Sequence, residues 1–154
     1  MADSKKDKST QLGLATPADD PSSVPYGLAP RLPISFNKRD GVANIKSYKE
    51  LATQNLKMLL LTVPGERIMD PNFGVGLSTY LFEQNHPSTH ATITSKIYEQ
   101  VGRYLPFLEI QNVIYRGNGP EHDVFDGNLL NVEIQFLIIP LQLSTVLELS
   151  LESN

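Results

Sequence analysis

The chain has 154 residues, no cysteine and a formal net charge of −4 at pH 7. The length indicates one domain, and the lack of cysteine excludes disulfides, thiolate chemistry and thiolate-rich zinc sites. The negative charge argues against nucleic acid as the main partner, the N-terminus shows no signal-peptide pattern, and no apolar run approaches the ~20 residues that span a membrane.

The N-terminal segment, residues 1–28, is polar. It contains charged side chains, several Ser and Thr, and Pro17, Pro21 and Pro25, without a run of apolar residues. Such a composition cannot offset the entropy cost of ordering the chain. We therefore expect a disordered tail over 1–28, either a solvated leader or a segment that orders on a partner, followed by one folded domain over 29–154.

The first predicted helix covers residues 46–61. Ser47 and Glu50 form a capping-box pattern at its start, and apolar residues recur behind them at helical spacing. Pro64 and Gly65 end this pattern. A short extended segment and a turn precede the helix.

A second helix and three strands follow. The helix begins at Pro87, with Ser88 as its expected cap, and ends before Pro106. Beyond it the hydrophobic period changes from 3.6 to 2, which predicts strands. Helices followed by strands indicate an α+β fold: two main helices packed on a small antiparallel sheet, with an extended N-terminal tail. The predicted strands cover residues 107–115, 132–138 and 143–151.

The segment between the helices is a loop with strict backbone requirements. Its prolines are stiff and its glycines permissive, and loops of this kind often hold a shape for recognition. Glu66 stands beside Arg67, which favours an ion pair. Arg67 either ties the loop down or contacts a partner through its planar guanidinium. The expected structural residues of the loop are Pro64, Gly65, Asp70, Pro71, Phe73 and Gly74.

Catalytic and metal sites are not predicted. Glycoside hydrolysis needs two carboxyl groups around one bond, and the candidates are Glu66, Asp70 and Glu83. Glu66 suits an ion pair with Arg67 better than a general acid. The three histidines, His86, His90 and His122, are scattered in a way more typical of surface residues than of a metal site, so no catalytic residue, metal or cofactor is expected.

The last predicted strand is long, rich in leucine and close to the C-terminus. An edge strand offers unpaired N–H and C=O groups, to which another chain can add a strand. The alternative is that this strand packs wholly within its own sheet. The residues expected to bind a partner strand are Leu143, Thr145, Leu147, Leu149 and Leu151.

The order of these motifs resembles one family, the baseplate wedge proteins of contractile phage tails, also called sheath initiators and sometimes labelled baseplate lysozymes. The resemblance covers about residues 44–151. Many family members carry Glu-Pro-Arg after the second helix, whereas this chain has Leu105-Pro106-Phe107 and retains only the proline. The residues that carry the resemblance are Gly65-Glu66-Arg67, Asp70-Pro71-Asn72-Phe73-Gly74, Leu77 and Leu81-Phe82-Glu83.

The resemblance implies a structural protein without enzymatic activity. It implies six copies around the tail tube or hub, docked on wedge subunits and offering an edge strand to the arms of the sheath subunit. The implied location is the virion tail baseplate, assembled in the host cytoplasm, without contact to nucleic acid or membrane. The implied wedge contacts are Glu66, Arg67, Leu105 and Phe107, although burial of Leu105 and Phe107 in the core is an equal alternative.

Two other functions are weighed against this one. The first is a cell-wall-degrading, lysozyme-like tail enzyme. The second is the equivalent subunit of a bacterial secretion system or an extracellular injection system. The residues do not separate a phage tail from these related machines.

Overall fold

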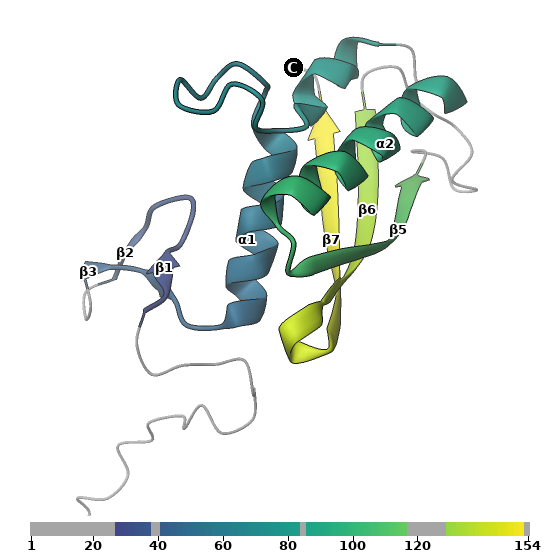
Figure 1. Cartoon of the computed structure of the whole chain (residues 1–154). Coiled ribbons are helices and arrows are strands. Elements are labelled where there is room, and N and C mark those ends of the chain that lie inside the picture. Colours follow the sequence, from purple (N-terminus) through teal and green to yellow (C-terminus); the bar gives the residue numbers. More distant parts are fainter. Residues whose placement is uncertain (1–26, 38–40, 84–85, 117–128, 153–154) are drawn as a thin grey trace, which may run out of the picture.

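The structure is a computed structural model that describes residues 27–37, 41–83, 86–116 and 129–152. Its main elements are two helices, a short 3-10 helix and a three-stranded sheet (Figure 1). The predicted α+β class is therefore confirmed. Almost all of the predicted tail 1–28, and the polar loop before the second strand, lie outside the described residues. The helical elements are α1 (Tyr48–Leu61), η1 (Leu77–Phe82) and α2 (Pro87–Tyr104).

The main sheet contains the three predicted strands in the order β5-β6-β7, so β6 lies in the centre. Both pairs are antiparallel, and Ile138 lies opposite Leu108 on one side and Leu143 on the other. Gln111 has no partner on β6, because the register shifts between Ile110 and Asn112. The strands are β5 (Leu108–Arg116), β6 (Leu129–Ile138) and β7 (Leu143–Glu152).

The hydrophobic core lies between one face of this sheet and the two helices (Figure 1). Because side chains alternate along a strand, β6 sends every second residue into the core and the others to the opposite face. The helices contribute Leu56, Leu59 and Leu60 from α1 and Ile93 and Ile97 from α2, all with no exposed surface. The core residues of β6 are Leu130, Val132, Ile134, Phe136 and Ile138.

The start of α1 differs from the prediction. Ser47 is the N-cap residue, but its side chain makes no capping hydrogen bond. The Glu50 carboxylate instead accepts a hydrogen bond at 2.9 Å from the guanidinium of Arg31, on the segment that precedes the helix. The Ser47 side chain therefore does not make the contact that the predicted capping box assigned to it, and the Glu50 carboxylate binds a charged partner in another segment.

Helix α2 begins at Pro87 as predicted, but its cap residue differs from the prediction by two positions. His86 is the N-cap, and Pro87 occupies the first turn. Proline fits there because its missing N–H would lack a helical partner in any case. Ser88, predicted as the cap, lies inside the helix, where its hydroxyl is 3.3 Å from Nδ1 of His86.

A small N-terminal arm of two strand pairs lies beside α1 (Figure 1). Gln54 of α1 fixes it: the Leu32 N–H donates to Gln54 Oε1 at 2.8 Å, and Gln54 Nε2 donates to the Pro30 carbonyl at 3.0 Å. Ile45, at the end of the arm, is 2% exposed. The strands are β1 (Ala29–Pro30) with β4 (Asn44–Ile45), and β2 (Phe36–Asn37) with β3 (Gly41–Val42).

Candidate functional site

The loop between α1 and η1 has a backbone fixed at both ends. The Gly65 N–H donates to the Pro71 carbonyl at 2.8 Å and closes the loop. Gly74 has φ +111, and a β-carbon there would lie 2.1 Å from the Thr62 carbonyl oxygen. Its N–H donates to Oε1 of the buried Gln100 at 3.0 Å. Only glycine fits position 74, and the loop therefore returns to the core at a defined point.

Aromatic and cationic side chains stack between this loop and the end of α2. The guanidinium of Arg67 lies 3.6 Å from the centre of the Phe73 ring, and Phe73 meets Tyr104 edge-on at 4.9 Å. The Tyr104 hydroxyl donates to Asp70 at 3.0 Å; partial burial and this hydrogen bond raise the Tyr104 pKa above its usual 10.0. The Arg103 guanidinium lies 5.2 Å from the centre of the Tyr104 ring. We call Arg67, Phe73, Tyr104 and Arg103 the aromatic ladder.

Glu66 does not form the predicted ion pair with Arg67. Its Oε2 accepts a hydrogen bond at 3.0 Å from the Val63 N–H, just beyond the end of α1. The Arg67 guanidinium is held over the Phe73 ring instead. Among the described residues, the salt bridges are Arg31–Glu50 and Arg116–Glu133. The predicted pair is wrong because each side chain finds its own partner within the loop.

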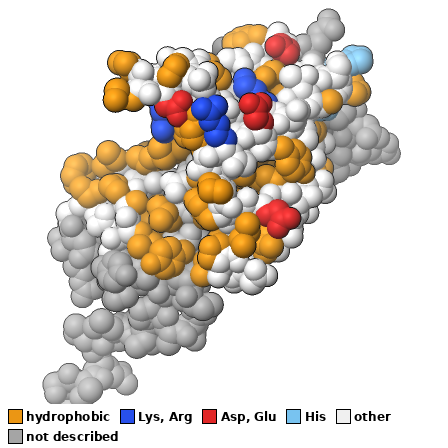
Figure 2. All heavy atoms as spheres, in the orientation of Figure 1, with side chains coloured by type: hydrophobic (Ala, Val, Ile, Leu, Met, Phe, Trp, Pro, Cys, Tyr) orange, Lys and Arg blue, Asp and Glu red, His pale blue; other side chains and the backbone are white. Residues whose placement is uncertain are grey.

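The tip of the loop carries two apolar side chains that sequence reasoning did not single out. Ile68 is 95% exposed and Met69 is 97% exposed. Figure 2 shows hydrophobic side chains at the end of this projecting loop, beside acidic and basic ones. An adjacent apolar pair between charged residues, in a loop flanked by two prolines, was the available signal. Exposed apolar groups on a fixed support are typical of protein contacts.

Leu105 and Phe107, the other predicted wedge contacts, differ in exposure. Leu105 is 8% exposed and belongs to the core. Phe107 is half-buried, and with Tyr48, Leu51 and Leu141 it lines an apolar groove of about 430 Å³. Of the two residues, Phe107 is therefore the one that offers side-chain surface to a partner.

Strand β7 lies at an edge of the sheet, as the sequence led us to expect. All ten of its residues pair with β6, and within the described part of the chain β6 is its one strand neighbour. Its inward row consists of Leu143, Thr145, Leu147, Leu149 and Leu151, with Leu147 and Leu149 each 7% exposed. In an antiparallel pair, alternate residues direct their backbone groups away from the partner. The outer edge of β7 thus offers hydrogen-bonding groups over a well-packed apolar row.

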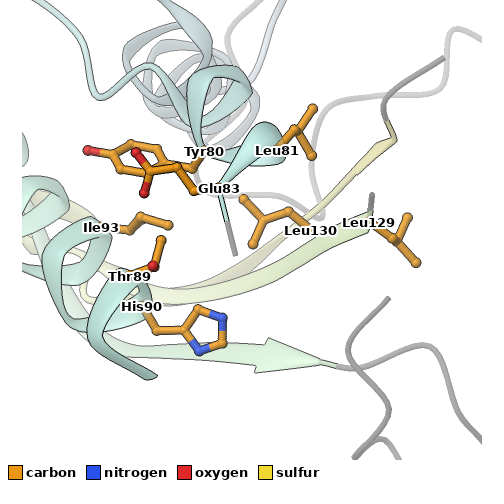
Figure 3. Close-up of a pocket in the computed structure, with 8 residues that line it drawn as sticks. All are labelled: Tyr80, Leu81, Glu83, Thr89, His90, Ile93, Leu129 and Leu130. Atoms are coloured by element: carbon orange, nitrogen blue, oxygen red, sulfur yellow. The ribbon is translucent and has the colours of Figure 1, made fainter. Parts of the chain in front are cut away.

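Figure 3 shows the small pocket that contains Glu83 and His90, beside Tyr80 and Leu130. Its volume is about 10 Å³, roughly the room needed by one water molecule. Partial burial, and then the nearby His86, lower the His90 pKa below its usual 6.5. This pocket is far too small for a sugar ring.

The other candidate chemistry of the sequence can also be placed. Asp70 accepts the Tyr104 hydrogen bond, and Glu66 holds the Val63 N–H. Over residues 27–37, 41–83, 86–116 and 129–152, no group of three or more His, Asp or Glu side chains is arranged to hold a metal ion. No helix in that part of the chain is long and apolar enough to cross a membrane. His122 lies outside the described residues.

Two solved structures share this architecture. A putative tail lysozyme from Geobacter sulfurreducens aligns with a TM-score of 0.59 over 73% of this chain and 96% of its own, at 20% identity. A chain of the anti-feeding prophage baseplate aligns with a TM-score of 0.58 over 70% of this chain and 82% of its own, at 28% identity. The first likeness concerns the fold alone; the second is to a chain of a baseplate.

The family follows from the sequence match. The baseplate wedge protein gp25 family matches residues 46–140, and the chain belongs to this family. The baseplate wedge protein gp25 of Enterobacteria phage T4 is 35% identical over 97 residues, which cover 59% of this chain and 67% of the T4 protein. The protein is therefore a structural component of a contractile-tail baseplate, as the motifs around Arg67 indicated.

Proposed function

We propose that this protein docks on the wedge subunits of the baseplate and nucleates the tail sheath. In this proposal, an extended arm of the first sheath subunit adds to β7 as a fourth strand. The single observation that carries the proposal is the position of β7 at the sheet edge, paired on one side over its full length. Backbone groups at such an edge supply affinity for an added strand, and the side-chain rows supply specificity.

The side chains of β7 support strand addition. Its inward row is apolar except for Thr145. Within the sheet, this row lies beside Phe136 and Ile134 of β6, neither of which is exposed. Its outward row contains polar residues and Val146, which is 48% exposed. An added strand with the same alternation would extend both the core and the outer face.

We propose that the wedge subunits dock on the loop that follows the C-terminal end of α1. Ile68 and Met69 project from a loop whose backbone is already fixed by Gly65 and Gly74. A preorganised loop loses little conformational entropy on binding. We place Arg67 in the same contact. We propose a second wedge contact at Phe107, in the groove beside Tyr48 at the start of α1, with Leu105 supporting Phe107 from the core.

The family supports the wider setting of this proposal. We propose six copies around the tail tube or hub, in the virion of a phage that assembles in the host cytoplasm. We also propose that the protein has no enzymatic activity. The pocket around Glu83 is too small for a sugar. Glu66 accepts a hydrogen bond from the Val63 N–H, and Asp70 accepts one from the Tyr104 hydroxyl of α2.

The edge of β7 is tested by proline substitutions that spare the core. Deleting β7 would expose the core residues that pack against Leu147 and Leu149 and would unfold the domain. The single substitutions Ser144→Pro and Thr145→Pro are therefore compared instead. Of two adjacent strand residues, one directs its N–H to β6 and the other to the free edge. The variant that keeps the wild-type melting temperature has lost an outward donor, and we expect it to form baseplates without sheath in electron micrographs.

The matched control is Gln111→Pro, at the unpaired bulge position of β5. It disturbs the opposite edge of the sheet and should leave sheath assembly normal. Normal sheath on baseplates that contain the folded β7 variant would refute strand addition. Loss of sheath with both variants would point to a general packing defect instead.

Wedge docking is tested by the double substitution Ile68→Ser and Met69→Ser. Both side chains are almost fully exposed, so the free energy of unfolding should stay within about 0.5 kcal/mol of wild type. We expect the wedge subunits to stop co-purifying with the variant. Tyr98→Ser, at an exposed position of α2, is the control that should retain them. Unchanged co-purification of the loop variant would exclude the tip.

Two assays address the rival functions. Robust clearing of cell walls by the purified protein, lost in Glu66→Gln or Glu83→Gln, would establish an enzyme. The 28% identity to an anti-feeding prophage baseplate chain favours a second setting, an injection particle without a genome. Electron micrographs of particles that contain this protein decide between the two settings, because only a phage carries a DNA-filled capsid.

A further inference from the structure

We infer that Thr145 and Glu148 determine the register of the strand added to β7. The added strand then has a defined chemistry: a side chain that forms hydrogen bonds faces inward opposite Thr145, and a lysine or arginine faces outward opposite Glu148. This inference rests on the proposed function, since it requires that β7 accepts a strand. It adds the identity of the side chains that β7 selects.

The first observation is the hydroxyl of Thr145. Its Oγ1 is buried and has no hydrogen-bond partner, and among the described side chains it is the one such atom. Its neighbours within the sheet, on the inward face, are Leu143 and Leu147 along the strand and Phe136 across it, none of which can accept or donate a side-chain hydrogen bond. The remaining neighbour position within the sheet lies beyond the free edge. A polar side chain on an added strand would supply the missing partner there.

The second observation is the carboxylate of Glu148. It lies directly opposite Glu133 of β6 on the outward face, and like charges in this arrangement destabilise a sheet. Glu133 is already engaged, because it accepts hydrogen bonds from Arg116 and Gln135. Glu148 has no salt bridge among the described residues. A cation on an added strand would lie opposite Glu148 on its vacant side.

The charge of the whole outward row points the same way. The row contains Ser144, Val146, Glu148, Ser150 and Glu152, so it has two acidic residues and no basic residue. Arg116 of β5 is directed to Glu133. The edge of β7 is therefore acidic on its outward side, which selects a basic partner strand.

The spacing of the two residues defines one register. Thr145 and Glu148 are three residues apart and lie on opposite faces of the strand. A slip of one residue would exchange the two faces of the added strand. A slip of two residues would keep the faces but move both polar side chains away from their partners. The two sites together select one alignment among those that backbone pairing alone allows.

The probes are two synthetic peptides of ten residues with alternating Val and Ser, N-methylated on alternate residues so that they cannot form sheets with each other. In the matched peptide, one inward Val is replaced by Thr and one outward Ser by Lys, at the positions opposite Thr145 and Glu148. In the shifted peptide both replacements move by two residues, which leaves the composition unchanged. Each peptide is made in two versions, one with the replacements placed for antiparallel pairing with β7 and one with them placed for parallel pairing. Fluorescence anisotropy measures the Kd of each peptide for the wild-type protein.

We expect the matched peptide to bind about tenfold tighter than the shifted peptide, since a partnered buried hydroxyl and a cross-strand charge pair each contribute a factor of about three to five. Thr145→Val should raise the melting temperature of the free protein and weaken the matched peptide about fivefold. A purely structural Thr145 would leave peptide binding unchanged.

Glu148→Gln should weaken the matched peptide about threefold and reduce the salt dependence of its Kd. The control is Glu109→Gln, an exposed carboxylate on the opposite edge strand β5, which should change neither quantity. Equal Kd values for the matched and shifted peptides would overturn the register inference and leave strand addition intact. Failure of every peptide to bind the wild-type edge would overturn both.

Discussion

The guanidinium of Arg67 lies 3.6 Å from the centre of the Phe73 ring, across a loop that the Gly65–Pro71 hydrogen bond closes. This contact bears on the two roles that the sequence left open for Arg67. The side chain is held within its own loop, and it still reaches solvent with its charge. A cation–π contact at an exposed site contributes about 0.5–1 kcal/mol, so Arg67 orders the loop and remains available to a partner.

Gly74→Ala should destabilise the protein by at least about 2 kcal/mol. The substitution places a β-carbon 2.1 Å from the Thr62 carbonyl oxygen and forces alanine to φ +111, a conformation that side chains disfavour. Urea unfolding followed by circular dichroism measures the loss. The control is Gly102→Ala in α2, where nothing lies within 4 Å of the new β-carbon; it should stabilise the helix by about 0.5–1 kcal/mol. Surface substitutions change the free energy of unfolding by roughly ±0.5 kcal/mol. A loss smaller than about 0.5 kcal/mol for Gly74→Ala would therefore contradict a fixed backbone at this position.

Gln100→Leu should cost about 1–3 kcal/mol, because it leaves the buried N–H of Gly74 without an acceptor. Gln100→Glu keeps an acceptor at the same place and should recover hydrogen-exchange protection of the Gly74 amide, although it buries a charge. Native-state hydrogen exchange at that amide reads the contact directly. Protection that survives in the leucine variant would show that another group accepts this N–H.

Tyr104→Phe should make the protein less sensitive to alkaline pH. Burial and the hydrogen bond to Asp70 raise the Tyr104 pKa above 10.0, so the folded state favours the protonated phenol. The stability from this group is complete below pH 10 and is lost as pH rises through the folded pKa. Between about pH 9 and pH 11, the free energy of unfolding should therefore fall more steeply for the wild type than for Tyr104→Phe. Equal slopes would show that Tyr104 ionises as easily in the folded state as in the unfolded state. This pH interval brackets the ordinary tyrosine pKa of about 10. Burial also raises the Tyr115 pKa, so some alkaline sensitivity remains in the variant.

Glu133→Gln should reduce the loss of stability in acid. Hydrogen bonds from Arg116 and then Gln135 lower the Glu133 pKa below its usual 4.5. The folded state thus favours the carboxylate, and its contribution is present above pH 4.5 and is lost as pH falls through the folded pKa. Urea midpoints at neutral pH and at about pH 3, below the ordinary glutamate pKa, measure the difference. Asn112→Ala, an uncharged change on the same face of the sheet, should keep the wild-type acid dependence; equal dependence in Glu133→Gln would contradict the assignment.

Local sequence patterns predicted the main elements because each pattern has a local physical cause. Apolar residues at helical spacing indicated α1, Pro64 and Gly65 indicated its end, and the change to alternating residues after Pro106 indicated the strands. These features depend on side-chain periodicity and on the backbone limits of proline and glycine.

The misplaced contacts depend on which partners the folded backbone brings within reach of each side chain. Glu50 has a capping-box spacing, yet Arg31, 19 residues earlier, takes its carboxylate. Glu66 and Arg67 are adjacent, yet one holds the Val63 N–H and the other stacks on Phe73. Side-chain partners of this kind are chosen among groups that only the folded chain brings together.

The sequence by itself determined the α+β class and the motifs that placed the chain in its family, because periodicity, turn residues and motif order are properties of the chain. Tertiary structure decided which strand lies at the sheet edge, which of Leu105 and Phe107 is buried, and that Ile68 and Met69 are exposed. It also decided that Thr145 lacks a partner and that Glu148 faces another acid. These facts depend on strand order, register and packing, which arise only when distant segments share one core.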